Sequence, residues 1–156
     1  MEEYMTGMES VEEIQYIVVK LGDEQYGIDI SYVDNIVRMQ RITRVPKSQS
    51  YYVGVINLRG EVVPIMSLRR KFGLEDDVYA NATRIIIIRT EDQSMIGFIV
   101  DEVQEVVNLD PRKIEKPAFK LDEENASFLS GIGKKSDESL ISLLDIVAVV
   151  EDKKEA

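Results

Sequence analysis

Short apolar runs rich in valine and isoleucine recur along the chain, and turn residues separate them. The runs fall into four pairs: 14–21 with 26–30, 53–58 with 62–66, 84–89 with 95–101, and 128–133 with 139–144. Short runs joined by Gly-containing or polar turns predict β-hairpins. Pro64 has no N–H for a sheet ladder, so its strand is expected to lie at an edge or to carry a bulge there.

Helical patterns are few and short, so the chain is predicted to be all-β with minor helices. Ser31 and Asp34 fit a capping box. Val33, Ile36 and Val37 are at helical spacing and would lie on one face of the predicted helix. The predicted helices cover residues 31–37, 68–72 (ended by Gly73) and 144–150.

The chain also repeats itself. Residues 27–37 (GIDISYVDNIV) align with 97–107 (GFIVDEVQEVV), and most apolar positions coincide. Three further matches are 17–19 with 86–88, 54–55 with 131–132, and 62–65 with 140–143. We therefore expect two pseudo-symmetric lobes, about 14–82 and 83–150, each a five-stranded β-barrel because closure removes exposed strand edges. Halves this small should share a core, and both arrangements, with and without strands that cross between the halves, stay open at this point.

The amino-acid composition excludes several kinds of metal site and catalytic group. The chain has no His and no Cys, which excludes the usual zinc sites, imidazole bases, Ser-His-Asp triads and thiol nucleophiles. The absence of disulfides fits a reducing compartment. Residues 1–13 hold five Glu and no apolar stretch, so we expect a disordered acidic tail there, a short tail at 151–156, and a cytoplasmic protein.

Charge is unevenly distributed. The chain has a net charge of −10, yet residues 38–71 hold eight basic side chains and one acid, Glu61. One explanation is a surface that meets an acidic partner. The other is that these side chains are scattered over several faces. The basic residues are Arg38, Arg41, Arg44, Lys47, Arg59, Arg69, Arg70 and Lys71.

Three stretches follow one another in order: LGDEQYGIDI with VDNI (21–30 and 33–36), VGVINLRGEVVPI (53–65) and GFIVDEV (97–103). Together they resemble the CheW family of chemotaxis adaptors, and the resemblance spans about residues 14–150. The resemblance implies a non-catalytic scaffold without cofactor or metal. It would couple the cytoplasmic tips of chemoreceptors to the regulatory domain of the histidine kinase CheA. It would be a monomer when free, recruited to membrane-associated receptor arrays without inserting into the membrane.

The resemblance also implies a groove between the lobes that receives a receptor helix. The alternative is that its apolar residues are ordinary core. Arg59 is expected to be exposed in a hairpin turn, with Gly60 at positive φ and Asn57 bonding the turn backbone. Asn35 departs from the family, in which Glu is frequent at this position. The predicted receptor-binding residues are Ile30, Val33, Asn35, Ile36, Arg59, Gly60, Val103 and Val106.

The resemblance implies that the kinase contact is made by exposed loops, edge to edge, and the candidate loops are residues 89–94 and the region after Gly131. The predicted residues are Arg89, Thr90, Ser94 and Gly131.

Three alternatives remain at this stage. A nucleic-acid-binding barrel could use the basic 38–71 segment with Tyr51 and Tyr52 as stacking residues, although the net charge opposes it. A carboxylate enzyme could use Asp29 and Asp101, although nothing in the sequence encloses them. A scaffold of another signalling array would share the fold. The acids Asp122, Glu123 and Glu124 do not match a calcium loop.

Overall fold

The elements of the computed structural model follow the predicted hairpins closely. The structure describes residues 12–116 and 127–151. The acidic stretch 1–11, the acids at 122–124 and the end 152–156 lie outside the described residues. In chain order the elements are β1 (Ile14–Leu21), β2 (Glu24–Asp29), the 3-10 helix η2 (Ile30–Tyr32), β3 (Val33–Arg38), β4 (Tyr52–Leu58), β5 (Glu61–Ser67), α1 (Leu68–Lys71), β6 (Arg84–Arg89), β7 (Met95–Val100), β8 (Glu102–Leu109), the 3-10 helix η3 (Pro111–Lys113), β9 (Leu129–Lys134), β10 (Leu140–Leu144) and α3 (Ile146–Val150).

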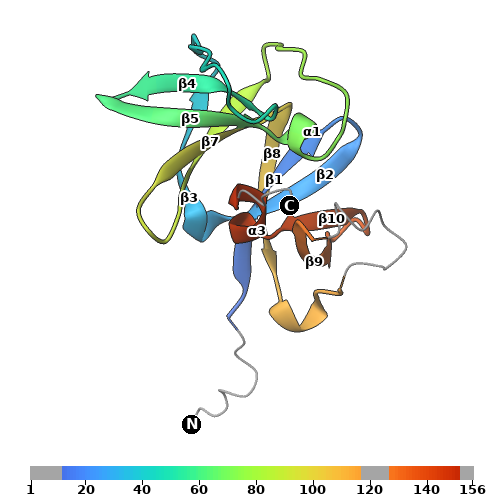
Figure 1. Ribbon diagram of the computed structural model, residues 1–156. Coiled ribbons are helices and arrows are strands. Elements are labelled where there is room, and N and C mark those ends of the chain that lie inside the picture. The colour runs from blue at the N-terminus through green and yellow to red at the C-terminus, as the bar shows by residue number, and fades with distance from the viewer. Residues whose placement is uncertain (1–11, 117–126, 152–156) are drawn as a thin grey trace.

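The strands form two five-stranded sheets of matching topology (Figure 1). One has the order β8-β1-β2-β10-β9 and the other β3-β6-β7-β5-β4. If β1 is exchanged with β6, β2 with β7, and so on up to β5 with β10, the strand order of one sheet becomes that of the other. This agrees with the sequence repeat. Each sheet takes strands from both sides of the expected boundary at residues 82 and 83, so the halves exchange strands.

The predicted closed barrels are wrong, although the all-β class is confirmed. In each sheet the pairing ends on two different strands, β3 and β4 or β8 and β9, and does not join them. A single bridge covers the free edge of β4, where Thr43 and Val55 exchange two backbone hydrogen bonds of 2.8 Å. Glu115 does the same for Ile132 on β9. The chain after β3 or β8 thus reaches the far edge with one residue rather than a strand.

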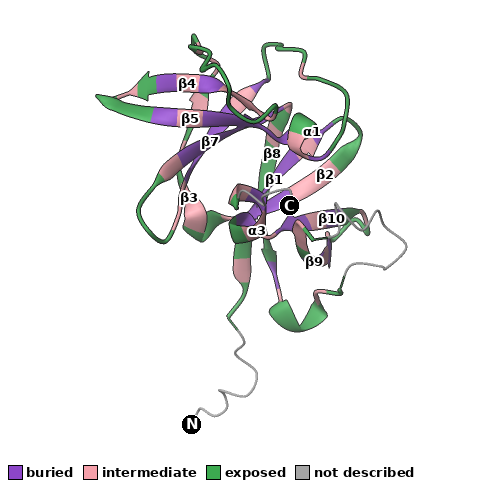
Figure 2. Ribbon diagram, viewed as in Figure 1, coloured by how far each residue is buried: buried purple, intermediate pink, exposed green. Residues whose placement is uncertain are grey.

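A core shared by the two sheets holds the molecule together (Figure 2). The central strands β1 and β6 are buried on both faces, which explains why they read as continuous apolar runs. On β6, Ile86 and Ile88 join the shared core, whereas Ile85 and Ile87 face a smaller cluster within their own sheet. The shared core draws on β1, β2 and β10 of one sheet and on β5, β6 and β7 of the other.

The helix expected at residues 31–37 is the main error in secondary structure. Asp29 caps the short η2 by accepting the Ser31 N–H (2.9 Å), and the chain then enters β3. Strand β3 alternates half-buried and exposed positions, the period of a strand whose one face is covered. The three apolar residues that spacing had assigned to one helical face therefore lie on both faces of a strand.

The other local predictions fare better. The helices α1 and α3 form where expected, capped by Ser67 and Asp145. Strand β5 lies inside its sheet, so the expected edge position was wrong for the strand as a whole. Pro64 nevertheless precedes residues 65–67, which pair with β7, and so lies outside that parallel ladder. Within the described residues, no helix is long and apolar enough to cross a membrane.

Candidate partner-binding site

The β4–β5 turn presents Arg59 as expected. Arg59 (φ 52°) and Gly60 (φ 85°) both have positive φ, which makes this two-residue connection a type I′ turn between Leu58 and Glu61. The Gly60 N–H donates to Asn57 Oδ1 (3.1 Å), so Asn57 supports the turn as predicted. A non-glycine residue in this conformation is uncommon, and Arg59 is held there with an exposed side chain.

Arg59 opens onto a small polar hollow of about 200 Å³. The hollow is also lined by Leu58, Glu61, Met95, Asp34 and Arg89. Asp34 of β3 and Arg89 of β6 form an ion pair of 3.3 Å. The structure thus brings together Arg59, expected at the receptor contact, and Arg89, expected at the kinase contact. This proximity was not predicted, because Asp34 was expected on a helix.

The apolar residues expected in the receptor groove divide into two groups. Val33 and Val103 are half-buried and pack against the same shared core, although they come from equivalent strands of different sheets. Ile30, Ile36 and Val106 are 36%, 38% and 50% exposed. Val33 and Val103 are therefore partly core residues, as the alternative interpretation held. The other three side chains are exposed at the surface, where a partner can contact them.

Asn35 has a local role. Its Oδ1 accepts the Ile36 N–H (2.8 Å) beside the register shift between Val33 and Asn35 in the pairing of β3 with β6. An acceptor at this position supports the irregular edge of β3.

The β6–β7 turn holds two of the expected kinase-contact residues, Thr90 and Ser94, in a hydrogen-bonded arrangement, and Arg89 ends β6 beside it. The Thr90 N–H donates to Ser94 O (2.9 Å). Asp92 accepts the Thr90 hydroxyl and the Ser94 N–H. Hydrogen bonding to Thr90, and then to Ser94, lowers the pKa of Asp92, so the turn carries a fixed negative charge.

Gly131 precedes the loop in which the kinase contact was expected and is not itself exposed. It is buried in β9, where a side-chain Cβ would meet Ile114 Cγ2 at 2.4 Å. The equivalent Gly54 would meet Thr43 O at 2.1 Å. Both glycines therefore let the single bridging residues Glu115 and Thr43 approach the sheet edge, which is a structural reason for the repeat to conserve glycine between the two halves.

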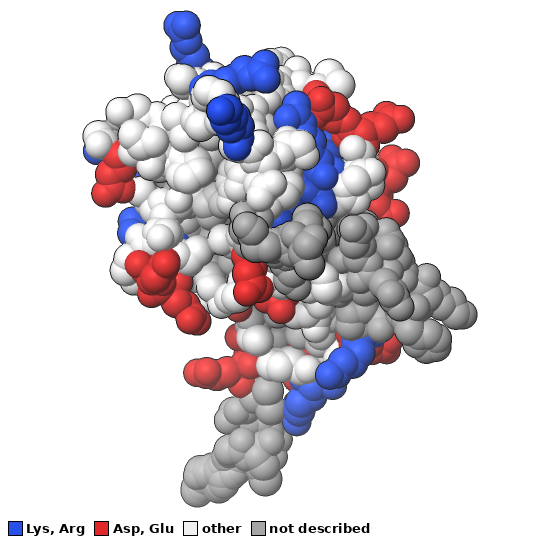
Figure 3. All heavy atoms as spheres, viewed as in Figure 1, with Lys and Arg blue, Asp and Glu red and all other residues white. Residues whose placement is uncertain are grey.

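The structure does not support single-strand stacking by Tyr51 and Tyr52. Their rings lie 5.1 Å apart, they pack against the shared core, and Lys71 Nζ lies 3.9 Å from the Tyr51 ring centroid. Lys and Arg side chains gather at the top of the view in Figure 3, above β4 and the preceding loop, but Arg69 and Arg70 are engaged in ion pairs. Some of the basic side chains of residues 38–71 thus form contacts within the protein.

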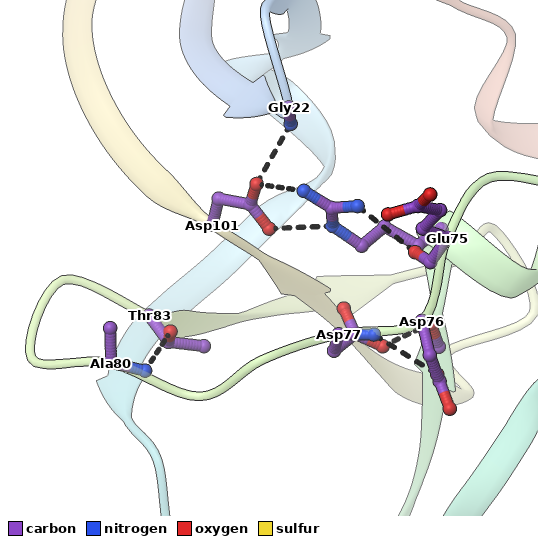
Figure 4. Close-up of polar contacts among 9 residues, drawn as sticks. Gly22, Glu75, Asp76, Asp77, Ala80, Thr83 and Asp101 are labelled. Atoms are coloured by element: carbon purple, nitrogen blue, oxygen red, sulfur yellow. Dashed lines mark hydrogen bonds and ion pairs between the residues drawn. The ribbon is translucent and has the colours of Figure 1, made fainter.

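The two acids considered for catalysis also have structural partners. Asp29 caps η2. The Asp101 carboxylate accepts hydrogen bonds from Arg69 Nε (2.9 Å), from Arg69 Nη2 (2.6 Å) and from the Gly22 N–H (2.8 Å), and Figure 4 draws these contacts. Hydrogen bonding to Arg69 is the main cause that lowers the Asp101 pKa, so this carboxylate stays ionised rather than serving as a proton donor.

Comparison with known proteins decides the family. The CheW-like domain model matches residues 15–154. The chain belongs to the CheW family. It is 36% identical over 140 residues to the chemotaxis protein CheW of Helicobacter pylori, covering 90% of this chain and 83% of that protein. With CheW of Bacillus subtilis it shares 33% identity over 135 residues, covering 86% and 85%.

A solved structure agrees in fold. The scaffolding protein TtCheW from Thermoanaerobacter tengcongensis superposes with a TM-score of 0.80 at 31% identity, covering 90% of this chain and 89% of TtCheW. This CheW protein is therefore a chemotaxis adaptor or scaffold and not an enzyme. The chemotaxis role is favoured over nucleic-acid binding and over another type of array.

Proposed function

We propose that this CheW protein couples the cytoplasmic tips of chemoreceptors to the regulatory domain of the kinase CheA through two neighbouring surfaces. The receptor surface comprises Ile30, Ile36 and Val106 with the turn residues Arg59 and Gly60. The half-buried Val33 and Val103 lie beneath as its support, and Asn35 stabilises its β3 edge. In this proposal the protein is a cytoplasmic monomer when free and is recruited to receptor arrays.

The observation that carries the proposal is the exposure of apolar side chains on β3 and β8. Ile36 and Val106 are 38% and 50% exposed on equivalent strands of the two sheets. Apolar stripes beside charged side chains are what a docked amphipathic helix recognises. The Arg59 guanidinium adds paired donors suited to carboxylates or carbonyl oxygens of such a helix.

The kinase surface in this proposal is the β6–β7 turn, with Arg89, Thr90 and Ser94. Its internal hydrogen bonds fix its shape before binding, which lowers the entropy lost on association. Gly131 contributes by shaping β9 rather than by contact. The hollow lined by both Arg59 and Arg89 is where the two surfaces meet.

The test is binding of a receptor-tip fragment to Ile36→Asp and Val106→Asp. Each should weaken binding by about 1–3 kcal/mol, because a carboxylate then faces an apolar helix surface. Leu140→Asp is the matched control, since Leu140 is 59% exposed on β10 and outside the proposed surface. Calorimetric titration measures the three affinities. Equal losses in all three variants, or none in the first two, would remove β3 and β8 from the receptor contact.

A further inference from the structure

A second and larger hollow lies between α3, η2 and the β6–β7 turn. It has a volume of about 470 Å³. Val147 of α3, 54% exposed, stands at its edge. Its apolar lining consists mainly of Tyr32, Tyr52, Pro64, Met95, Val147 and Val150.

The internal repeat shows that this hollow is a departure from symmetry. In the equivalent place of the other half, α1 is tied to the β7–β8 junction and to the β1–β2 turn. Arg69 pairs with Asp101 (2.6 Å), and Asp101 accepts the Gly22 N–H. The N-caps Ser67 and Asp145 align α1 with α3, which puts Val147 at the position of Arg69.

The acid of that bridge is replaced as well. The alignment of residues 27–37 with 97–107 puts Ser31 at the position of Asp101. The Ser31 hydroxyl donates to Asp29 instead (2.9 Å). A valine cannot form the bridge, so the junction that an ion pair closes in one half is left open and apolar in the other.

The rim of the hollow carries charge of one sign. The charged residues among its lining are Glu91, Asp92 and Glu151, all acidic. Figure 3 shows acidic side chains at the lower left, over the β6–β7 turn that occupies the same place in Figure 1. Asp92 is fixed by Thr90 and Ser94, so part of this charge is held in place at the edge of the apolar floor.

We propose that this open junction docks a protein segment that carries a large apolar side chain flanked by lysine or arginine. The apolar floor supplies affinity, and the acidic rim selects a basic segment and fixes its register. This docking site goes beyond receptor and kinase coupling and depends on neither. Thr90 and Ser94, which belong to the proposed kinase surface, also lie on the rim of the hollow.

The probe is a synthetic helical peptide with leucines at helical spacing on one face and lysines beside them. A second peptide replaces every lysine by glutamate. Methyl NMR of the full chain should show the Leu/Lys peptide shifting the signals of Met95, Ile96 and Val147, and the shifts should weaken at high salt. The Leu/Glu peptide should leave these signals in place.

Val147→Asp should weaken binding of the Leu/Lys peptide about tenfold or more, because it adds an unpaired carboxylate to the apolar floor. Leu140→Asp is the matched control and should keep the wild-type affinity. The double variant S31D/V147R installs the bridge of the other half and should abolish the shifts while keeping a folded spectrum.

Three results would overturn the proposal. One is equal binding of the two peptides, and another is unchanged affinity in Val147→Asp. The third is binding only after removal of residues 152–156, which would assign the hollow to the chain's own end rather than to a partner.

Discussion

At the residue scale, Arg59 is an arginine in a turn conformation that favours asparagine or glycine. Its φ of 52° places it in the left-handed region, where a side chain is tolerated at some cost. Among the residues that the structure describes, the exposed guanidinium forms no hydrogen bond or ion pair that would offset that cost, which is consistent with selection for binding rather than for stability.

Arg59 can therefore be separated from the fold by substitution. Arg59→Asn should keep or slightly raise the free energy of unfolding, since Asn is favoured at the first position of a type I′ turn. The same variant should weaken receptor-tip binding by about 1–3 kcal/mol, the scale of losing a charged hydrogen bond. Urea unfolding and calorimetric titration measure the two quantities.

Arg59→Glu and Arg41→Glu form the charge-matched pair for this prediction. Both change the net charge equally, but Arg41 is an exposed residue of the loop after β3 and does not line the hollow. Arg59→Glu should lose far more affinity. If the two variants lose the same affinity, the effect is one of overall charge and Arg59 is not in the contact.

At the element scale, the bridge between Arg69 and Asp101 joins α1, the β7–β8 junction and the β1–β2 turn. The pKa of Asp101 is lowered in the folded protein, mainly by its hydrogen bond to Arg69. A lowered carboxyl pKa contributes stability that is present above the ordinary value of 3.8 and is lost as pH falls through the folded value.

Asp101→Asn should accordingly lower the free energy of unfolding at neutral pH. The difference between wild type and variant should shrink as the pH falls from the ordinary Asp value through the lowered folded value, because the unfolded carboxylate is protonated first and the folded one last. Chemical unfolding of both proteins over a pH series measures it. A difference that stays constant down to acidic pH would show that the bridge contributes through packing and not through charge.

Gly131 provides a second element-scale prediction, for the single bridge that covers the edge of β9. Gly131→Ala should destabilise the protein by about 1–3 kcal/mol, since the new methyl group would collide with Ile114. Lys134→Ala, exposed on the same strand, should change the unfolding free energy little. Wild-type stability in Gly131→Ala would mean that the bridging segment moves away freely.

At the scale of the whole molecule, the sequence predicts the hairpins and the repeat because turn residues and apolar runs are local signals. It does not predict β3, because Ser31 and Asp34 imitate a helix start and the strand's alternation is short. It wrongly predicts closed barrels, and it leaves open whether strands are exchanged between the halves. Both depend on which strand edges meet, as at Thr43 and Val55, and pairing partners leave no mark in hydrophobic periodicity.

The candidate site shows the same limit. The turn conformation of Arg59 and Gly60 and its support by Asn57 were predicted correctly because the turn is local, whereas the binding role of Arg59 and Gly60 stays a prediction. The ion pair between Asp34 and Arg89 joins residues 55 positions apart in sequence. The open junction beside Val147 is likewise visible only once α1 and α3 can be compared in space.

In the proposed function, this small protein offers separate surfaces to two partners. Paired NMR titrations of the labelled protein, one with a receptor-tip fragment and one with a CheA regulatory domain, test it most directly. We expect the receptor fragment to shift the signals of Ile36, Arg59 and Val106, and the kinase domain to shift those of Thr90 and Ser94. Identical perturbations by both partners, or none from either at high concentration, would contradict the coupling of receptor and kinase by this protein.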